Sequence, residues 1–195
     1  MELVKLFGWA VLLAPAGIVL HELGHFVTGS MLGFPVRLNV GSVSGGPTLG
    51  SAADWEVAVV AAAGPLVTVV LMAVAAIGLV RNRAANWALA LALTAPLRLI
   101  VGGSYLFWVA KASLANIPFQ GTPDFDEYNA ALALGLSPVA VVAVQMIALI
   151  AYWIWSASRP PRGRRLLKVG IVLVGAVAGI SIWMALIGPA LLSIL

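Results

Sequence analysis

Five long apolar segments constrain the fold of this chain of 195 residues more than any other feature of the sequence. A transmembrane α-helix needs about 20 consecutive, mainly apolar residues. The segments cover about 6–29, 55–80, 85–110, 138–157 and 169–194. Polar or Pro/Gly-rich connections separate them at 81–86, 111–129 and 158–168. We therefore predict an all-α polytopic membrane protein with about five transmembrane helices.

The charged residues support this class of protein and suggest its topology. Only 9% of the residues are charged, whereas about a quarter are charged in soluble domains. The basic residues lie mostly in the short connections 81–86 and 158–168, where they orient membrane helices, so no nucleic-acid partner is expected. These two connections are expected on one face of the membrane, and the 116–126 loop on the other. We expect a multi-pass protein of the cell membrane, with the lipid bilayer as its surroundings.

The stretch 33–56, which follows the first apolar segment, is too short and too Gly-rich to cross a membrane. Within it, "VRLNV" (36–40) alternates apolar and polar residues, as half-buried strands do. Non-helical backbone at membrane depth requires protein or water to satisfy its hydrogen bonds. We expect a re-entrant segment or a β-hairpin beside the helices near 34–50, or a plain surface hairpin.

The most specific chemical signal is "HELGH" (21–25) inside the first apolar segment. Residues four apart lie on one face of a helix, so His21 and His25 can bind the same Zn²⁺. Zinc lowers the pKa of bound water, and Glu22 can accept the proton as the catalytic base. Ionisable residues within a membrane helix are costly and usually functional. The alternative is a pair of histidines that hydrogen-bond neighbouring helices.

A third metal ligand must be a carboxylate, because catalytic zinc usually has three protein ligands and the chain has only two histidines. Asp54 and Glu56 precede a predicted helix and are better explained as acids of its first turn. The remaining candidates lie together in "DFDE" (124–127), on the side expected for His25. Asp124 and Asp126 remain equal alternatives, although a capping box of Asp124 with Glu127 would leave Asp126 for the metal.

Three motifs in the sequence resemble those of the site-2 proteases, which are intramembrane zinc metalloproteases. "HELGH" (21–25) resembles their zinc helix, and "AAAGPLVT" (61–68) is similar to their AGPxxN helix. "NIPFQGTPD" (116–124) resembles their Asn-Pro…Asp motif, whose aspartate is the third zinc ligand. Thr68 stands where the family often has asparagine, and "DFDE" replaces the usual Asp-Gly-Gly.

The resemblance implies one metalloprotease-like transmembrane domain over 1–195, with core motifs at 10–130 and additional helices at 138–195. It implies an enzyme that binds one zinc per chain and hydrolyses peptide bonds in or near transmembrane segments of protein substrates. A non-catalytic, zinc-binding homologue that binds a membrane partner is the alternative. Substrate contacts are expected from Thr68 and Asn116.

Arg98 is a further candidate for a substrate-binding residue, because it interrupts the third apolar segment. Arginines inside membranes rarely go unpaired, so it is expected to pair with the acidic cluster or to orient the substrate. A displaced helix end that lets Arg98 extend to the membrane surface is the alternative.

Overall fold

The computed structural model describes residues 1–119, 121 and 123–192, apart from the side chains of residues 98, 99 and 192. Within this part of the chain, five helical stretches are long and apolar enough to cross a membrane. They are Glu2–Met31, Asp54–Arg81, Asn86–Leu114, Pro138–Ser158 and Arg162–Leu191. The prediction of a helical chain with five potential membrane spans is therefore confirmed.

Three of the spans are single helices, and two consist of several pieces. The single helices are α1 (Glu2–Met31), α2 (Asp54–Arg81) and α6 (Pro138–Ser158). The third span contains α3 (Asn86–Thr94), the 3₁₀ helix η1 (Ala95–Leu99) and α4 (Ile100–Leu114). The last span contains the 3₁₀ helix η2 (Arg162–Arg164), α7 (Arg165–Ile182), the π-helix η3 (Trp183–Ile187) and α8 (Gly188–Leu192). A short helix, α5 (Asp126–Ala133), lies between the third and fourth spans.

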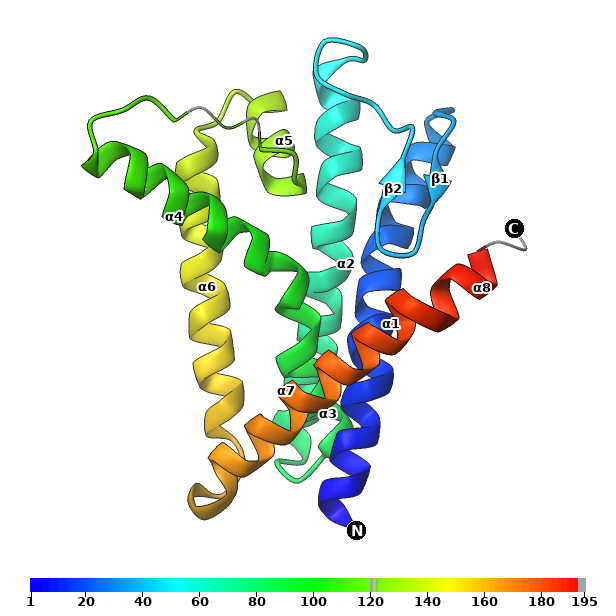
Figure 1. The fold of residues 1–195 in the computed structure, drawn as a ribbon, viewed down its shortest axis with the longest axis vertical. Helices are drawn as coiled ribbons and strands as arrows, with labels where there is room; N and C mark the ends of the chain where they lie inside the picture. The colour runs from blue at the N-terminus through cyan, green and yellow to red at the C-terminus, as the bar shows by residue number, and fades with distance from the viewer. Residues whose placement is uncertain (120, 122, 193–195) are drawn as a thin grey trace.

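The third span is interrupted by η1, which begins at Ala95 and contains Pro96. Proline has no amide hydrogen and clashes with the preceding helical turn, so the backbone changes there from α-helix to η1. Figure 1 shows the result: α4 runs obliquely away from α1, and its C-terminal end lies at the far side of the molecule. As a result, the C-terminal end of α4 lies away from α1, the helix that carries both histidines.

The two ends of the helical bundle differ as the charge pattern predicts. The N-terminus and the connections 82–85 and 159–164 lie at one end (Figure 1). The strands and the connection between α4 and α5 lie at the other end.

Ser137 begins α6 as its N-cap, and its hydroxyl accepts a hydrogen bond from the Ala140 amide at 3.4 Å. This N-cap agrees with the Ser-Pro pattern at the start of the fourth span.

The 34–50 segment contains a small β-hairpin. Strands β1 (Arg37–Leu38) and β2 (Val43–Ser44) pair antiparallel, with Leu38 opposite Val43. β1 packs against α1 (Figure 1). The indole N–H of Trp183, in η3, donates a hydrogen bond of 2.7 Å to the Val40 carbonyl in the hairpin turn. The hairpin is thus held between the first span and the last.

Helices α1 and α2 approach closely at small residues. A Cβ added at Gly24 would lie 2.8 Å from the Ala63 carbonyl oxygen, which is too short for a side chain. Small residues allow membrane helices to bring their backbones together. Because Gly24 lies within the HELGH motif, this contact places both histidines directly against α2.

Candidate metal centre

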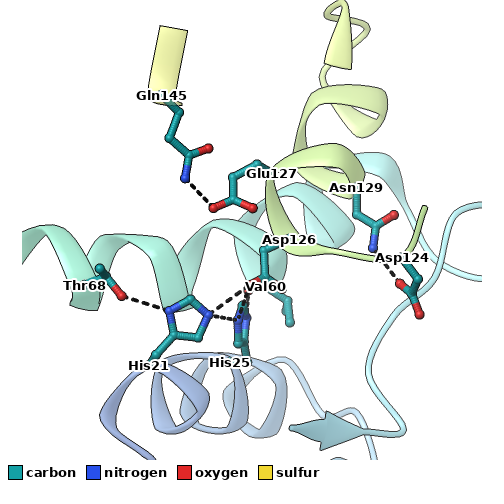
Figure 2. Close-up of polar contacts among 9 residues, drawn as sticks. All are labelled: His21, His25, Val60, Thr68, Asp124, Asp126, Glu127, Asn129 and Gln145. Carbon is teal, nitrogen blue, oxygen red and sulfur yellow. Dashed lines mark hydrogen bonds and ion pairs between the residues drawn. The ribbon is translucent and has the colours of Figure 1, made fainter. Parts of the chain in front are cut away.

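Helix α1 presents His21 and His25 on the face that meets α2, and Asp126 of α5 lies against the same two side chains (Figure 2). The two residues are four positions apart, which is about one helical turn. Both are buried, and their Nε2 atoms lie 3.2 Å apart. The two imidazoles therefore aim the same ring nitrogen at one point, as the HExxH spacing predicts.

The other ring nitrogen of each histidine contacts α2. Nδ1 of His25 donates a hydrogen bond of 2.7 Å to the Val60 carbonyl, which can only accept. Nδ1 of His21 lies 2.9 Å from the Thr68 hydroxyl, which can accept in the same way. In neutral rings of this tautomer, both Nε2 atoms carry a lone pair. Partners of this kind commonly orient histidines that bind metals.

Asp126, the first residue of α5, completes the cluster. Its Oδ2 lies 2.9 Å from Nε2 of His21 and 3.2 Å from Nε2 of His25. Two nitrogen lone pairs and a carboxylate repel one another unless a positive charge lies among them. The three residues thus form a group that could hold a metal ion.

Gly64 of α2 leaves the space that this cluster requires. A Cβ at this position would lie 2.7 Å from Nε2 of His21 and even closer to Nε2 of His25. The next residue, Pro65, removes one amide from the hydrogen-bond ladder of α2. Neither Gly64 nor the Val60 carbonyl was assigned a role from the sequence. The signal in the sequence was the stretch "AAAGPLVT" (61–68), whose resemblance to the AGPxxN helix gave no separate role to Gly64.

Glu22 lies beside His21 in α1 and is also buried, with 2% of its surface exposed. Its carboxylate is close enough to His25 to interact with it electrostatically. An acidic side chain is therefore enclosed at the edge of the histidine cluster.

The structure distinguishes the two aspartates that the sequence left as alternatives. Asp124 is exposed, and its Oδ1 accepts a hydrogen bond of 3.0 Å from the Asn129 amide, away from the histidines (Figure 2). The expected capping box with Asp124 as N-cap is wrong, because α5 begins at Asp126 and its N-cap is Phe125. Glu127 accepts a hydrogen bond from Gln145 instead. Only Asp126 of the pair lies with His21 and His25.

The first-turn explanation of Asp54 and Glu56 is supported. α2 begins at Asp54, and Oε2 of Glu56 accepts a hydrogen bond of 2.9 Å from the Ala53 amide. Glu56 thus satisfies a free amide at the start of the helix, where an acid is also favoured by the helix dipole.

The three predicted substrate contacts lie in different surroundings. Thr68 is 1% exposed and contacts His21, so it lies behind the imidazole. Asn116 is exposed at the C-terminal end of α4, with a φ of 53°, and Ile117 donates to Ala112 as in a Schellman motif. Among the described residues, no contact joins Asn116 to the metal cluster. The side chain of Arg98 lies outside the described part of the structure.

Aromatic side chains hold the start of α5 against α4. The ring of Tyr105, in α4, packs against Phe125 and Tyr128, with 5.5 Å between ring centroids in each pair. Phe119 contacts the same tyrosine at 5.8 Å. Such aromatic pairs add to the energy of apolar burial. Asp126 is therefore flanked by two anchored residues of its own segment.

A comparison of the chain with protein families, curated proteins and solved structures finds no match. The residues of the site define a possible metal centre of two histidines and one carboxylate, enclosed among helices long enough to cross a membrane.

Proposed function

We propose that the protein is an intramembrane zinc metalloprotease that hydrolyses peptide bonds in or near transmembrane segments of other proteins. One observation carries this proposal: His21, His25 and Asp126 converge on one point, beside the buried carboxylate of Glu22. The resemblance of 21–25, 61–68 and 116–124 to site-2 protease motifs supports the reaction and the class of substrate.

The residues of the cluster fit zinc. Zinc binds histidine nitrogen and carboxylate oxygen at about 2.0–2.2 Å, so the ligands of a tetrahedral site lie about 3.3–3.6 Å apart. The ligand atoms in this cluster are 2.9 to 3.2 Å apart and need to move outward only slightly. Three protein ligands leave a fourth position open, which is typical of catalytic rather than structural zinc sites. We infer one zinc per chain.

In this mechanism, the carboxylate of Glu22 transfers the proton. Zinc, when bound, would act as a Lewis acid on water and on the scissile carbonyl. Glu22 accepts a proton from the attacking water and passes it to the nitrogen of the leaving amine. Thr68 and the Val60 carbonyl keep the imidazoles in one tautomer and orientation during this transfer.

The substrate must be extended at the bond that is cleaved. In a helical transmembrane segment, the backbone hydrogen bonds hold the scissile carbonyl within the helix. A strand edge can replace these bonds when a peptide unwinds beside it. The β1–β2 hairpin packs against α1, the helix that carries both histidines. We therefore assign it the role of pairing with the unwound substrate.

The test compares wild type with Glu22→Gln, using the full chain purified in detergent and a model transmembrane peptide as substrate. We expect wild type to contain one zinc and to cleave the peptide. The variant should retain zinc and lose cleavage, because an amide cannot accept the proton. Full activity of the variant would refute the mechanism.

His25→Ala is the companion variant. It should lose both zinc and cleavage, because two protein ligands rarely hold a catalytic zinc. A full complement of zinc in this variant would contradict the ligand assignment. Wild type that binds zinc without cleaving any transmembrane peptide would favour the non-catalytic alternative.

A further inference from the structure

The position of Asp126 depends on a very short helix. α5 has 8 residues and follows a loop, and it packs against α2 on one side and α6 on the other (Figure 1). Isolated helices of this length are not stable in water. Contacts with neighbouring helices must therefore hold the Asp126 carboxylate near the histidines.

Glu127, the neighbour of Asp126, makes a side-chain contact with α6. Successive residues on a helix point about 100° apart, so the two carboxylates face different helices. Figure 2 shows Asp126 directed at the histidines and Glu127 directed at Gln145. The Gln145 amide donates a hydrogen bond of 2.5 Å to Oε1 of Glu127, and both side chains are partly buried.

Gln145 interrupts the apolar sequence "AVVAVQMIALI" (140–150) of a helix long enough to span a membrane. A polar side chain in such a helix is favourable mainly when it finds a partner on another element. Glu127 provides an ionisable acceptor, and hydrogen bonds to charged groups are stronger than those between neutral groups. The pair therefore explains the glutamine without an additional ligand.

Helix α6 also packs closely against α4. Val142 lies about one turn before Gln145 and is fully buried. A Cβ added at Gly102 of α4 would lie only 2.9 Å from Cγ1 of Val142, so the two helices are in close contact there. Met146 packs near Gly103, at 3.2 Å from an added Cβ. The Gln145 side chain thus projects toward α5 from a helix that close packing holds in place.

We propose that Gln145 is a positioning residue of the metal centre: through Glu127 it fixes the orientation of α5, and α5 presents Asp126 to the metal. This inference rests on the proposed metal site. It assigns a role in that site to α6, a helix that contributes no ligand. Loss of the Gln145 side chain should therefore weaken metal binding while all three ligands remain.

The test measures the affinity of the full chain for Zn²⁺ in detergent, by competition with a chromophoric chelator. Gln145→Leu, which keeps the helix apolar, should bind zinc several-fold more weakly, and by less than the ~10–100-fold lost when a direct hydrogen-bond partner of a ligand is removed. The exchanged pair Glu127→Gln with Gln145→Glu restores the hydrogen bond and should recover most of the affinity. Asn129→Ala is the matched control, because it removes the bond that α5 makes to Asp124 and leaves Gln145 untouched.

A second readout separates this inference from the proposed function. Amide hydrogen exchange in 126–133 should become faster in Gln145→Leu, while exchange in α1 stays as in wild type. If wild type binds no zinc, the proposed function fails, and this exchange still tests the contact. Unchanged zinc affinity in Gln145→Leu, or unchanged exchange where zinc is not bound, would overturn the inference.

Discussion

Gly64→Ala provides a sharp test of the metal centre, because it changes no ligand and no charge. The new Cβ would lie 2.7 Å from Nε2 of His21, whereas ordinary van der Waals contacts begin at 3.4 Å. The imidazole must therefore retreat by about 0.7 Å, and His25, which is closer still, must move further. Displacements of about 1 Å at a catalytic site can reduce activity about 10²-fold.

We expect Gly64→Ala to weaken zinc binding and to reduce peptide cleavage by about 10²-fold. Crowding of this kind also lowers the free energy of unfolding by about 1–3 kcal/mol. Zinc content after dialysis, peptide cleavage and thermal unfolding in detergent measure the three effects. The variant should remain folded, since alanine is otherwise favourable in a helix.

Gly8→Ala is the matched control. It places the same methyl group in a membrane-length helix, at a position where nothing lies within 4 Å of the added Cβ. Zinc binding and cleavage should stay as in wild type. If Gly64→Ala behaves like this control, the histidines do not occupy the space in front of Gly64, and the site geometry is wrong.

Two further predictions concern the third ligand and the topology. Asp126→Ala should lose zinc and activity, while Asp124→Ala should keep both and cost at most about 1 kcal/mol of stability; equal zinc content in the two variants would contradict the choice between these residues. Cysteines introduced singly at Arg83 and Gly121, in a chain that has none, should react with a membrane-impermeant reagent from opposite faces of sealed vesicles. Labelling of both from one face would exclude the five-span arrangement.

The spans and the histidine pair could be predicted because their signals are local. Apolar length is visible in the sequence and directly reflects the thickness of a bilayer. The spacing of His21 and His25 needs only the period of a helix to place them on one face. Both features depend little on how the helices pack together.

The choice between Asp124 and Asp126 could not be predicted, because it depends on where α5 begins. The pattern of Asp124 and Glu127 suggested a capping box, which would have started the helix earlier. In the structure, Glu127 bonds Gln145 and Phe125 packs on Tyr105, and both contacts join residues from distant parts of the sequence. Tertiary packing thus overrides a local capping pattern.

The hydrogen bond between Trp183 and Val40 makes the hairpin one of the last parts of the protein to be stabilised during synthesis. The two residues are 143 positions apart, so the hairpin receives this support only after the last span has been synthesised and has packed. The three residues of the candidate metal centre all precede residue 127, so they are synthesised well before the last span. A hairpin of two short strands is marginally stable alone. Under the proposed function, the group of His21, His25 and Asp126 would form before the hairpin is supported, and peptide capture would follow the packing of the last span.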